Sequence, residues 1–272
     1  MPPLPPRRFP LPGASSVLAA IAASLLLLFL IAPIVRLVAA GGGSGLARLA
    51  SDTELRSALA LTGITATVAT LIGVLTGTPL AYLLARRDFR GRALLAAILD
   101  LPLLIPHPVA GIALLLVLGR ESLVGSTLLL AGLRVVGTPI GIVCAMLFVS
   151  APLFVSGARE AFARVDPRFE SVARTLGDTP ARVFRRITLP LAGRGVLGAA
   201  VVMWARAVSE FGAIVILTYN PKTVSVLSYD RFTAYGLQEA IPAAAVLVIL
   251  ALVPLGLLRA LRTERAPSLP RA

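Results

Sequence analysis

Two opposite charges, Arg206 and Glu210, lie inside an otherwise apolar run of the sequence. Their spacing of four residues places both side chains on one face of a helix, where they can form an ion pair. Charges inside a long apolar run are costly, so they usually line a polar pathway or neutralise one another. The pair therefore has two interpretations, a structural ion pair between packed helices or part of a gate. Glu210 fits the ion pair better, while Arg206 suits either role.

The other residues capable of chemistry are few. The single histidine, His107, lies between Pro106 and Pro108, where packing at a kink is its expected role and gating is the alternative. One histidine and one cysteine, Cys144, exclude a multi-histidine or cysteine-based metal site within the chain. The hydrolase motifs G-x-S-x-G and H-E-x-x-H are absent, and so is a phosphate-binding G-x-x-x-x-G-K-[ST] loop. We expect no catalytic residue, no metal and no cofactor in this chain.

The elements that position these residues are indicated by composition. Of 272 residues, 57% are hydrophobic and 14% are charged, and the mean hydropathy is +0.89. Soluble domains average about 25% charged residues, so an ordinary cytosolic enzyme is excluded. The net charge of +13 could suggest nucleic-acid binding, but long uncharged apolar runs argue against it. The sequence predicts an all-α polytopic membrane protein.

Six apolar runs are long enough to cross a bilayer, which takes about 20 residues each. The third run contains Pro102, Pro106 and Pro108, which must break or kink it because proline lacks an N–H donor. We divide the chain into a lead at 1–14, one transmembrane domain at 15–261 and a tail at 262–272. The six predicted spans are 15–40, 57–85, 93–118, 138–158, 195–218 and 240–261.

Basic residues predict the orientation. Eighteen of the 26 arginines and lysines fall in the lead, in the loops after the second and fourth spans, or in the tail counted with Arg259 at the end of the sixth span, against six in the other loops. Because basic residues are retained in the cytoplasm, both termini and these two loops are predicted to be cytoplasmic in a multi-pass cell-membrane protein.

The longest of these loops, residues 159–194, carries eight arginines and is called the arginine-rich loop below. Asp166-Pro167 predicts a helix start and Gly177 its end, and a second short helix should run from Pro180 to Leu189-Pro190. Both helices are amphipathic, so they could lie on lipid headgroups or dock into a groove on a soluble partner.

The arginine-rich loop resembles the EAA loop of ABC-importer permeases. The pattern positions are Glu160, Ala161, Gly177, Ile187, Leu189 and Pro190, with Phe162 in place of the second alanine. The resemblance implies a coupling helix that fits a cleft in a cytoplasmic ABC ATPase subunit and transmits ATP-driven closure to the membrane helices. It also implies that ATP and Mg are bound by that partner chain, and that this chain is a transport subunit and not an enzyme.

Two further stretches narrow the resemblance. LPLLIPHPVAG at 101–111 and WARAVSEFGA at 204–213 look like spans of molybdate, tungstate and sulfate permeases, closest to the molybdate/tungstate branch. The implied assembly has two copies of this chain, two ATPases and one external binding protein, and it imports an oxyanion. The candidate path or gate is then formed by Arg206, Glu210, Phe211 and His107. A sulfate or thiosulfate permease is the alternative, followed by an ion-driven carrier, which would leave the arginine-rich loop unexplained.

The segment 219–239, called the tyrosine-rich loop below, holds three of the four tyrosines. It has two equal interpretations, an aromatic belt at the membrane interface with solvated charges or a docking surface for the external binding protein. The docking candidates are Tyr219, Lys222, Tyr229, Asp230 and Arg231.

Overall fold

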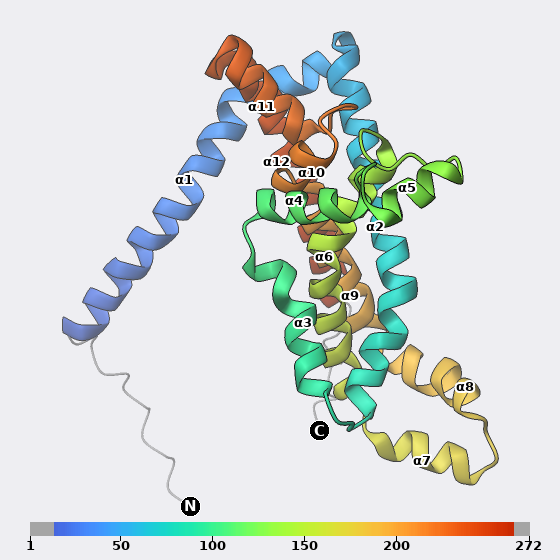
Figure 1. Ribbon diagram of the computed structural model, residues 1–272. Helices are drawn as coiled ribbons and strands as arrows, with labels where there is room; N and C mark the ends of the chain where they lie inside the picture. The colour runs from blue at the N-terminus through green and yellow to red at the C-terminus, as the bar shows by residue number, and fades with distance from the viewer. Residues whose placement is uncertain (1–13, 264–272) are drawn as a thin grey trace, which may run out of the picture.

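The computed structural model describes residues 14–263, and within them the chain forms helices joined by turns and short connections (Figure 1). In chain order they are α1 (Ala14–Ser51), α2 (Thr53–Arg86), α3 (Arg92–Leu104), α4 (His107–Leu118), α5 (Leu123–Leu130), α6 (Pro139–Ala163), α7 (Pro167–Thr175), α8 (Pro180–Val183), the π-turn η1 (Phe184–Thr188), α9 (Leu189–Val208), α10 (Gly212–Leu217), α11 (Val224–Tyr235) and α12 (Leu237–Thr263). The predicted lead and tail lie almost wholly outside the described residues. The predicted all-α fold is confirmed.

The count of about six spans is also confirmed. Five helices of the described part are long and apolar enough to cross a membrane, and α3 with α4, bent by 113°, makes a sixth if the pair is counted as one broken span. The bend falls at Ile105 and Pro106, within the proline cluster that predicted it. Pro106 precedes α4 and Pro108 lies in its first turn, where a missing N–H costs no helical hydrogen bond.

Two span boundaries were predicted wrongly. α1 continues past residue 40 through four glycines to Ser51, because α12 packs closely against it there. A Cβ on Gly41 would lie 2.4 Å from Ile241 Cγ2, so the approach needs glycine.

The predicted bounds of the fifth span, 195–218, are also wrong. Leu189-Pro190 does not end a helix. Pro180–Val208 is one continuous helical run, with the π-turn η1 immediately before Leu189. Proline clashes with the carbonyl one turn earlier and cannot donate to it, and a widened turn relieves both problems. The run then ends at Val208 instead of continuing to 218, and Ser209–Phe211 separate it from α10.

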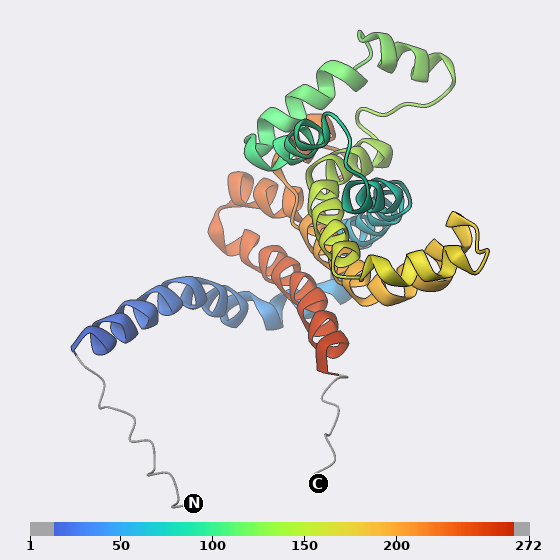
Figure 2. The same cartoon turned by 90° about the horizontal axis from the view of Figure 1, so that it is seen from below.

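The centre of the fold is a bundle of α2, α6 and α9, whose mutual packing buries small and apolar side chains (Figure 1). The arginine-rich loop projects from one end of this bundle, and α5 and α11 lie at the other end. The N-terminal part of α1 leans away from the bundle, as the second view also shows (Figure 2). The apolar stretch of α1 is unburied in the single chain.

Close packing between α6 and α9 depends on Gly195, and Gly193 in the same helix provides a matched control. A Cβ on Gly195 would lie 2.5 Å from Ala161 Cβ, whereas a Cβ on Gly193 would meet nothing within 4 Å. We expect Gly195→Ala to destabilise the protein by about 1–3 kcal/mol through overpacking. Gly193→Ala should be neutral or stabilising, because alanine favours a helix interior. Thermal unfolding in detergent measures both, and equal midpoints for the two variants would contradict the packing argument.

Candidate functional site

The predicted path residues meet where two helix breaks face each other. The connection Ser209–Phe211 between α9 and α10 lies against the start of α4, and a Cβ on Gly212 would be 2.7 Å from His107 Cβ. Arg206 Nη2 donates to Glu210 Oε2 at 2.8 Å and lies 2.8 Å from His107 Nε2. The structure therefore joins Arg206, Glu210 and His107 in one cluster, although 99 residues separate His107 from Arg206.

Both carboxylate oxygens of Glu210 accept hydrogen bonds, and the residue is only 1% exposed. Besides Arg206, it accepts the backbone N–H of Ala213 at 2.8 Å, in the first turn of α10. Its carbonyl accepts a hydrogen bond from Ser225 Oγ at the start of α11, also at 2.8 Å. The carboxylate therefore neutralises Arg206 and stabilises the break, as the ion-pair interpretation predicts. Arg206 cannot offer its full charge to an anion in this conformation.

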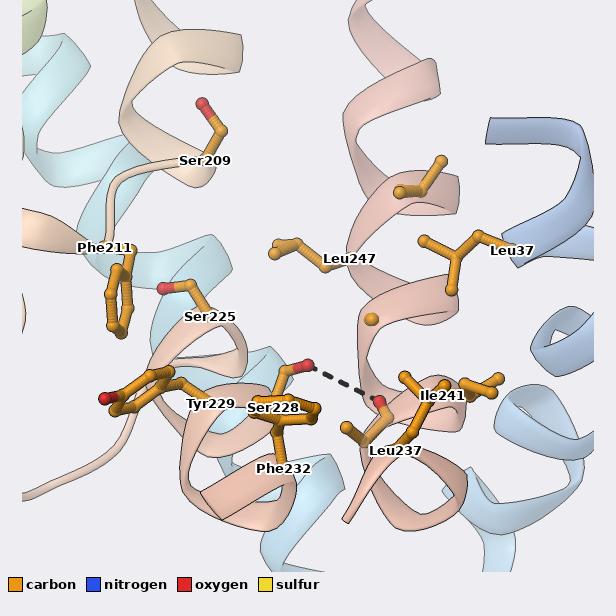
Figure 3. Close-up of a pocket in the computed structure, with 13 residues that line it drawn as sticks. Leu37, Ser209, Phe211, Ser225, Ser228, Tyr229, Phe232, Leu237, Ile241 and Leu247 are labelled. Carbon is orange, nitrogen blue, oxygen red and sulfur yellow. Dashed lines mark hydrogen bonds between the residues drawn. The ribbon is translucent and has the colours of Figure 1, made fainter. Parts of the chain in front are cut away.

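Phe211, the fourth path candidate, makes its ring contact with the tyrosine-rich loop. Its ring packs against Tyr229 with centroids 5.0 Å apart. Both rings line a cavity of about 480 Å³ that also reaches Leu37 of α1 and Leu247 of α12 (Figure 3). The lining is mostly apolar, so this cavity offers little compensation for the charge of an oxyanion.

The arginine-rich loop begins and turns as its sequence predicts. The Asp166 carboxylate accepts the backbone N–H of Arg168 at 2.9 Å and caps α7 ahead of Pro167. Gly177 has a φ of +92°, a left-handed conformation that favours glycine. The N–H groups of Gly177 and Asp178 donate back to the carbonyls of Arg174 and Ala173, the pattern of a Schellman motif.

A buried carboxylate that the sequence analysis did not single out holds this loop to the bundle. Glu170 of α7 is 5% exposed and accepts Arg86 Nε at 2.9 Å, Thr188 Oγ1 at 2.9 Å and Tyr82 OH at 3.2 Å. Arg86 also donates through Nη2 to the carbonyl of Val165 at 2.8 Å. One signal was available, because Glu170 and Ala173 follow helical spacing on the face of α7 that the structure buries.

The predicted pattern positions are distributed along the loop and its borders. Glu160 and Ala161 belong to the last turns of α6, where Ala161 is buried and the Glu160 side chain is 65% exposed and pairs with Arg164. Ile187 is in the π-turn, Leu189 and Pro190 begin α9, and Gly177 makes the turn after α7. Glu160 and Glu170 thus have different surroundings, and Glu170 is the buried one.

The outer side of α7 carries apolar side chains that nothing in the described chain covers. Phe169, Val172 and Leu176 are exposed, Leu176 to 82%. In the sequence these three residues and Ala173 recur at helical spacing, but of the four only Ala173 is buried. Exposed apolar residues beside arginines, at a projecting end, are typical of a contact with another protein or with a membrane surface.

The charges of the tyrosine-rich loop are largely paired with one another and with the start of α2. Lys222 Nζ donates to Asp230 Oδ2 at 2.6 Å and to Glu54 Oε1 at 3.2 Å. The bond to Asp230 holds the pKa of that carboxyl below its usual value and raises the pKa of Lys222. The Tyr219 hydroxyl also donates to Asp230.

Arg231 completes this contact between α11 and α2, which we call the α11 clamp. Its guanidinium lies 2.7 Å from Asp52 and 3.2 Å from Glu54, and the residue is 8% exposed. Of the five docking candidates, Tyr219 and Tyr229 keep exposed rings. Docking of a binding protein here stays a prediction.

Comparison with known proteins places the chain in a family. The family model for the binding-protein-dependent transport system inner membrane component matches residues 77–262. A molybdate/tungstate transport system permease protein of Thermococcus kodakarensis is 49% identical over 112 residues, which cover 41% of this chain and 45% of that protein. A molybdenum transport system permease protein of Haemophilus influenzae is 35% identical over 103 residues, covering 36% and 45%. The chain thus spans about half the length of the curated relatives it matches.

A solved structure shows the same fold. The crystal structure of a bacterial ABC transporter that imports the acidic polysaccharide alginate aligns with a TM-score of 0.68 at 19% identity, covering 92% of this chain and 96% of that one. The family model covers most of the described helices, from the end of α2 to α12, and includes both helix breaks and the arginine-rich loop. The chain therefore belongs to the family of binding-protein-dependent transport system inner membrane components.

Proposed function

We propose that this chain is the membrane permease subunit of an ATP-driven importer of an oxyanion, molybdate or tungstate. Family membership supports a transport role, and the named relatives that share 40–49% identity support the molybdate/tungstate branch. Relatives described as probable sulfate permeases share 30–31%, so sulfate is the second candidate. On this proposal the chain is not an enzyme, and a partner chain binds and hydrolyses ATP with Mg.

The observation that carries the proposal is the exposed apolar face of α7. The exposed Phe169, Val172 and Leu176 belong to α7 and the residue that ends it. In Figure 1, α7 projects from the end of the bundle that the basic residues predict to be cytoplasmic. A groove on an ATPase would cover these side chains, as an apolar helix face is covered in other helix-in-groove contacts. The buried Glu170 on the inner face would then pass the motion of α7 to the membrane helices.

The remaining partners follow from the same arrangement. The unburied apolar length of α1 suits lipid and a second copy of this chain, which would place two arginine-rich loops side by side for two ATPases. The opposite end, with α5 and α11, would face an external binding protein. Transport by alternating access would open the two helix breaks, and separating Arg206 from Glu210 would expose a cation to the passing anion.

Replacing Leu176 by glutamate tests whether the exposed apolar face of α7 binds the ATPase subunit. A charge at this exposed position should abolish co-purification of the ATPase subunit while leaving the permease folded, because Leu176 contributes little to the buried core. The matched control is Leu130→Glu, since Leu130 is 91% exposed on α5 at the opposite end. Retention of the ATPase by the control and its loss from Leu176→Glu supports the proposal. Failure of the wild-type chain to retain any ATPase overturns it.

A further inference from the structure

Glu170 has more partners than an ion pair needs. A carboxylate buried to this degree is destabilising unless its charge and lone pairs are satisfied, and here Arg86, Thr188 and Tyr82 satisfy them. Arg174 approaches from the exposed side at 3.9 Å. The bonds come from α2 and from the π-turn η1, so Glu170 fixes α7 relative to two other elements at once.

Arg86 ties the loop to α2 at a second point. Its Nε donates to Glu170 and its Nη2 to the carbonyl of Val165, just before α7. A planar guanidinium that spans two acceptors sets orientation as well as distance. One turn earlier on α2, the Tyr82 ring packs edge-on against Phe184 of η1 with centroids 4.9 Å apart. The segment before α7 and the π-turn η1 are therefore attached to consecutive turns at the C-terminal end of α2.

The opposite end of α2 is attached to α11. Asp52 and Glu54 bind Arg231 in the α11 clamp. Further along the helix, Thr62 Oγ1 accepts the backbone N–H of Val224 at 3.0 Å. The 34 residues of α2 span about 50 Å, which exceeds the thickness of the hydrocarbon core. One helix thus joins the arginine-rich loop to α11, which precedes α12 in the chain.

We propose that Glu170 is a positioning residue for energy coupling, which locks the arginine-rich loop to α2 so that a displacement of α7 is transmitted to the α11 clamp. This inference deepens the proposed function and rests on it. Without the lock, α7 would still bind the ATPase through its exposed face, but its movement would be absorbed by the loop. Binding and coupling should therefore separate when Glu170 loses its charge.

Proteoliposomes holding the full transporter measure both properties. Glu170→Gln keeps the shape of the side chain but removes the charge that Arg86 requires. We expect the ATPase to remain bound, and the amount of tungstate imported per ATP hydrolysed to fall about tenfold, the size of a typical coupling between distant sites. The control is Asp88→Asn, because Asp88 lies two residues beyond Arg86 with its side chain 94% exposed.

The outcomes distinguish this inference from the proposed function. Absence of ATP-dependent uptake by the wild type contradicts the proposed function itself. Normal uptake per ATP by Glu170→Gln, with an active wild type, overturns the positioning role alone. If Glu170→Gln fails to fold, Thr188→Val replaces it, because it removes one bond to Glu170 at nearly constant shape. A smaller loss of coupling in Thr188→Val with bound ATPase supports the inference, and unchanged coupling contradicts it.

Discussion

Glu210→Ala should destabilise the protein by about 3 kcal/mol, because breaking a buried ion pair leaves an uncompensated charge. The substitution removes the partner of Arg206 and the acceptor of the Ala213 N–H, so the connection between α9 and α10 loses two contacts. Thermal unfolding of the detergent-solubilised protein should show a lower midpoint.

The control for this prediction removes both charges. Replacing Arg206 and Glu210 together by glutamine leaves no unpaired charge, so the double variant should be more stable than Glu210→Ala. If the double variant is less stable than the single one, the two side chains do not compensate each other and the ion-pair interpretation fails.

Gly177→Val should remove the turn between α7 and α8 and with it the binding of the ATPase. Valine at a φ of +92° is strained by about 1–2 kcal/mol, because a Cβ crowds the backbone in the left-handed region. The loop can relieve this strain by abandoning the Schellman motif, which would reorient the exposed face of α7. We expect co-purification of the ATPase to be lost even though the transmembrane bundle stays folded.

The chain offers a matched control for Gly177→Val. Gly132 follows α5 at a φ of +81°, with the same pair of backbone bonds to the preceding turn. It lies at the end of the bundle away from the arginine-rich loop. Gly132→Val should therefore carry similar strain and keep the ATPase bound. Loss of the ATPase from both variants would show that general destabilisation, and not the loop, controls binding.

The features that the sequence predicted correctly are local ones. Long apolar runs predicted the spans, Pro106 and Pro108 predicted the bend between α3 and α4, and Gly177 predicted the end of α7. Each depends on properties of a few adjacent residues, such as a missing N–H or an allowed positive φ. Leu189-Pro190 misled the prediction, because a π-turn can accommodate a proline without ending the helix.

The features that the sequence did not predict depend on contacts between distant residues. Glu170 resembles an ordinary charge in a polar loop until Arg86, 84 residues earlier, is placed against it. The charges of the tyrosine-rich loop look solvated in the sequence, yet the structure pairs Arg231 with Glu54, 177 residues away. The meeting of His107 with Arg206 likewise follows from the packing of α4 against α10, which no local pattern encodes.

We propose that this chain forms the membrane path of an ATP-driven oxyanion importer. Uptake by proteoliposomes that contain the permease, its ATPase and its external binding protein tests it most directly, with tungstate supplied outside and ATP inside. We predict tungstate accumulation that requires ATP, is lost with Leu176→Glu and is not displaced by equal sulfate. Accumulation that proceeds without ATP on an ion gradient, or no accumulation of any oxyanion, would contradict the account.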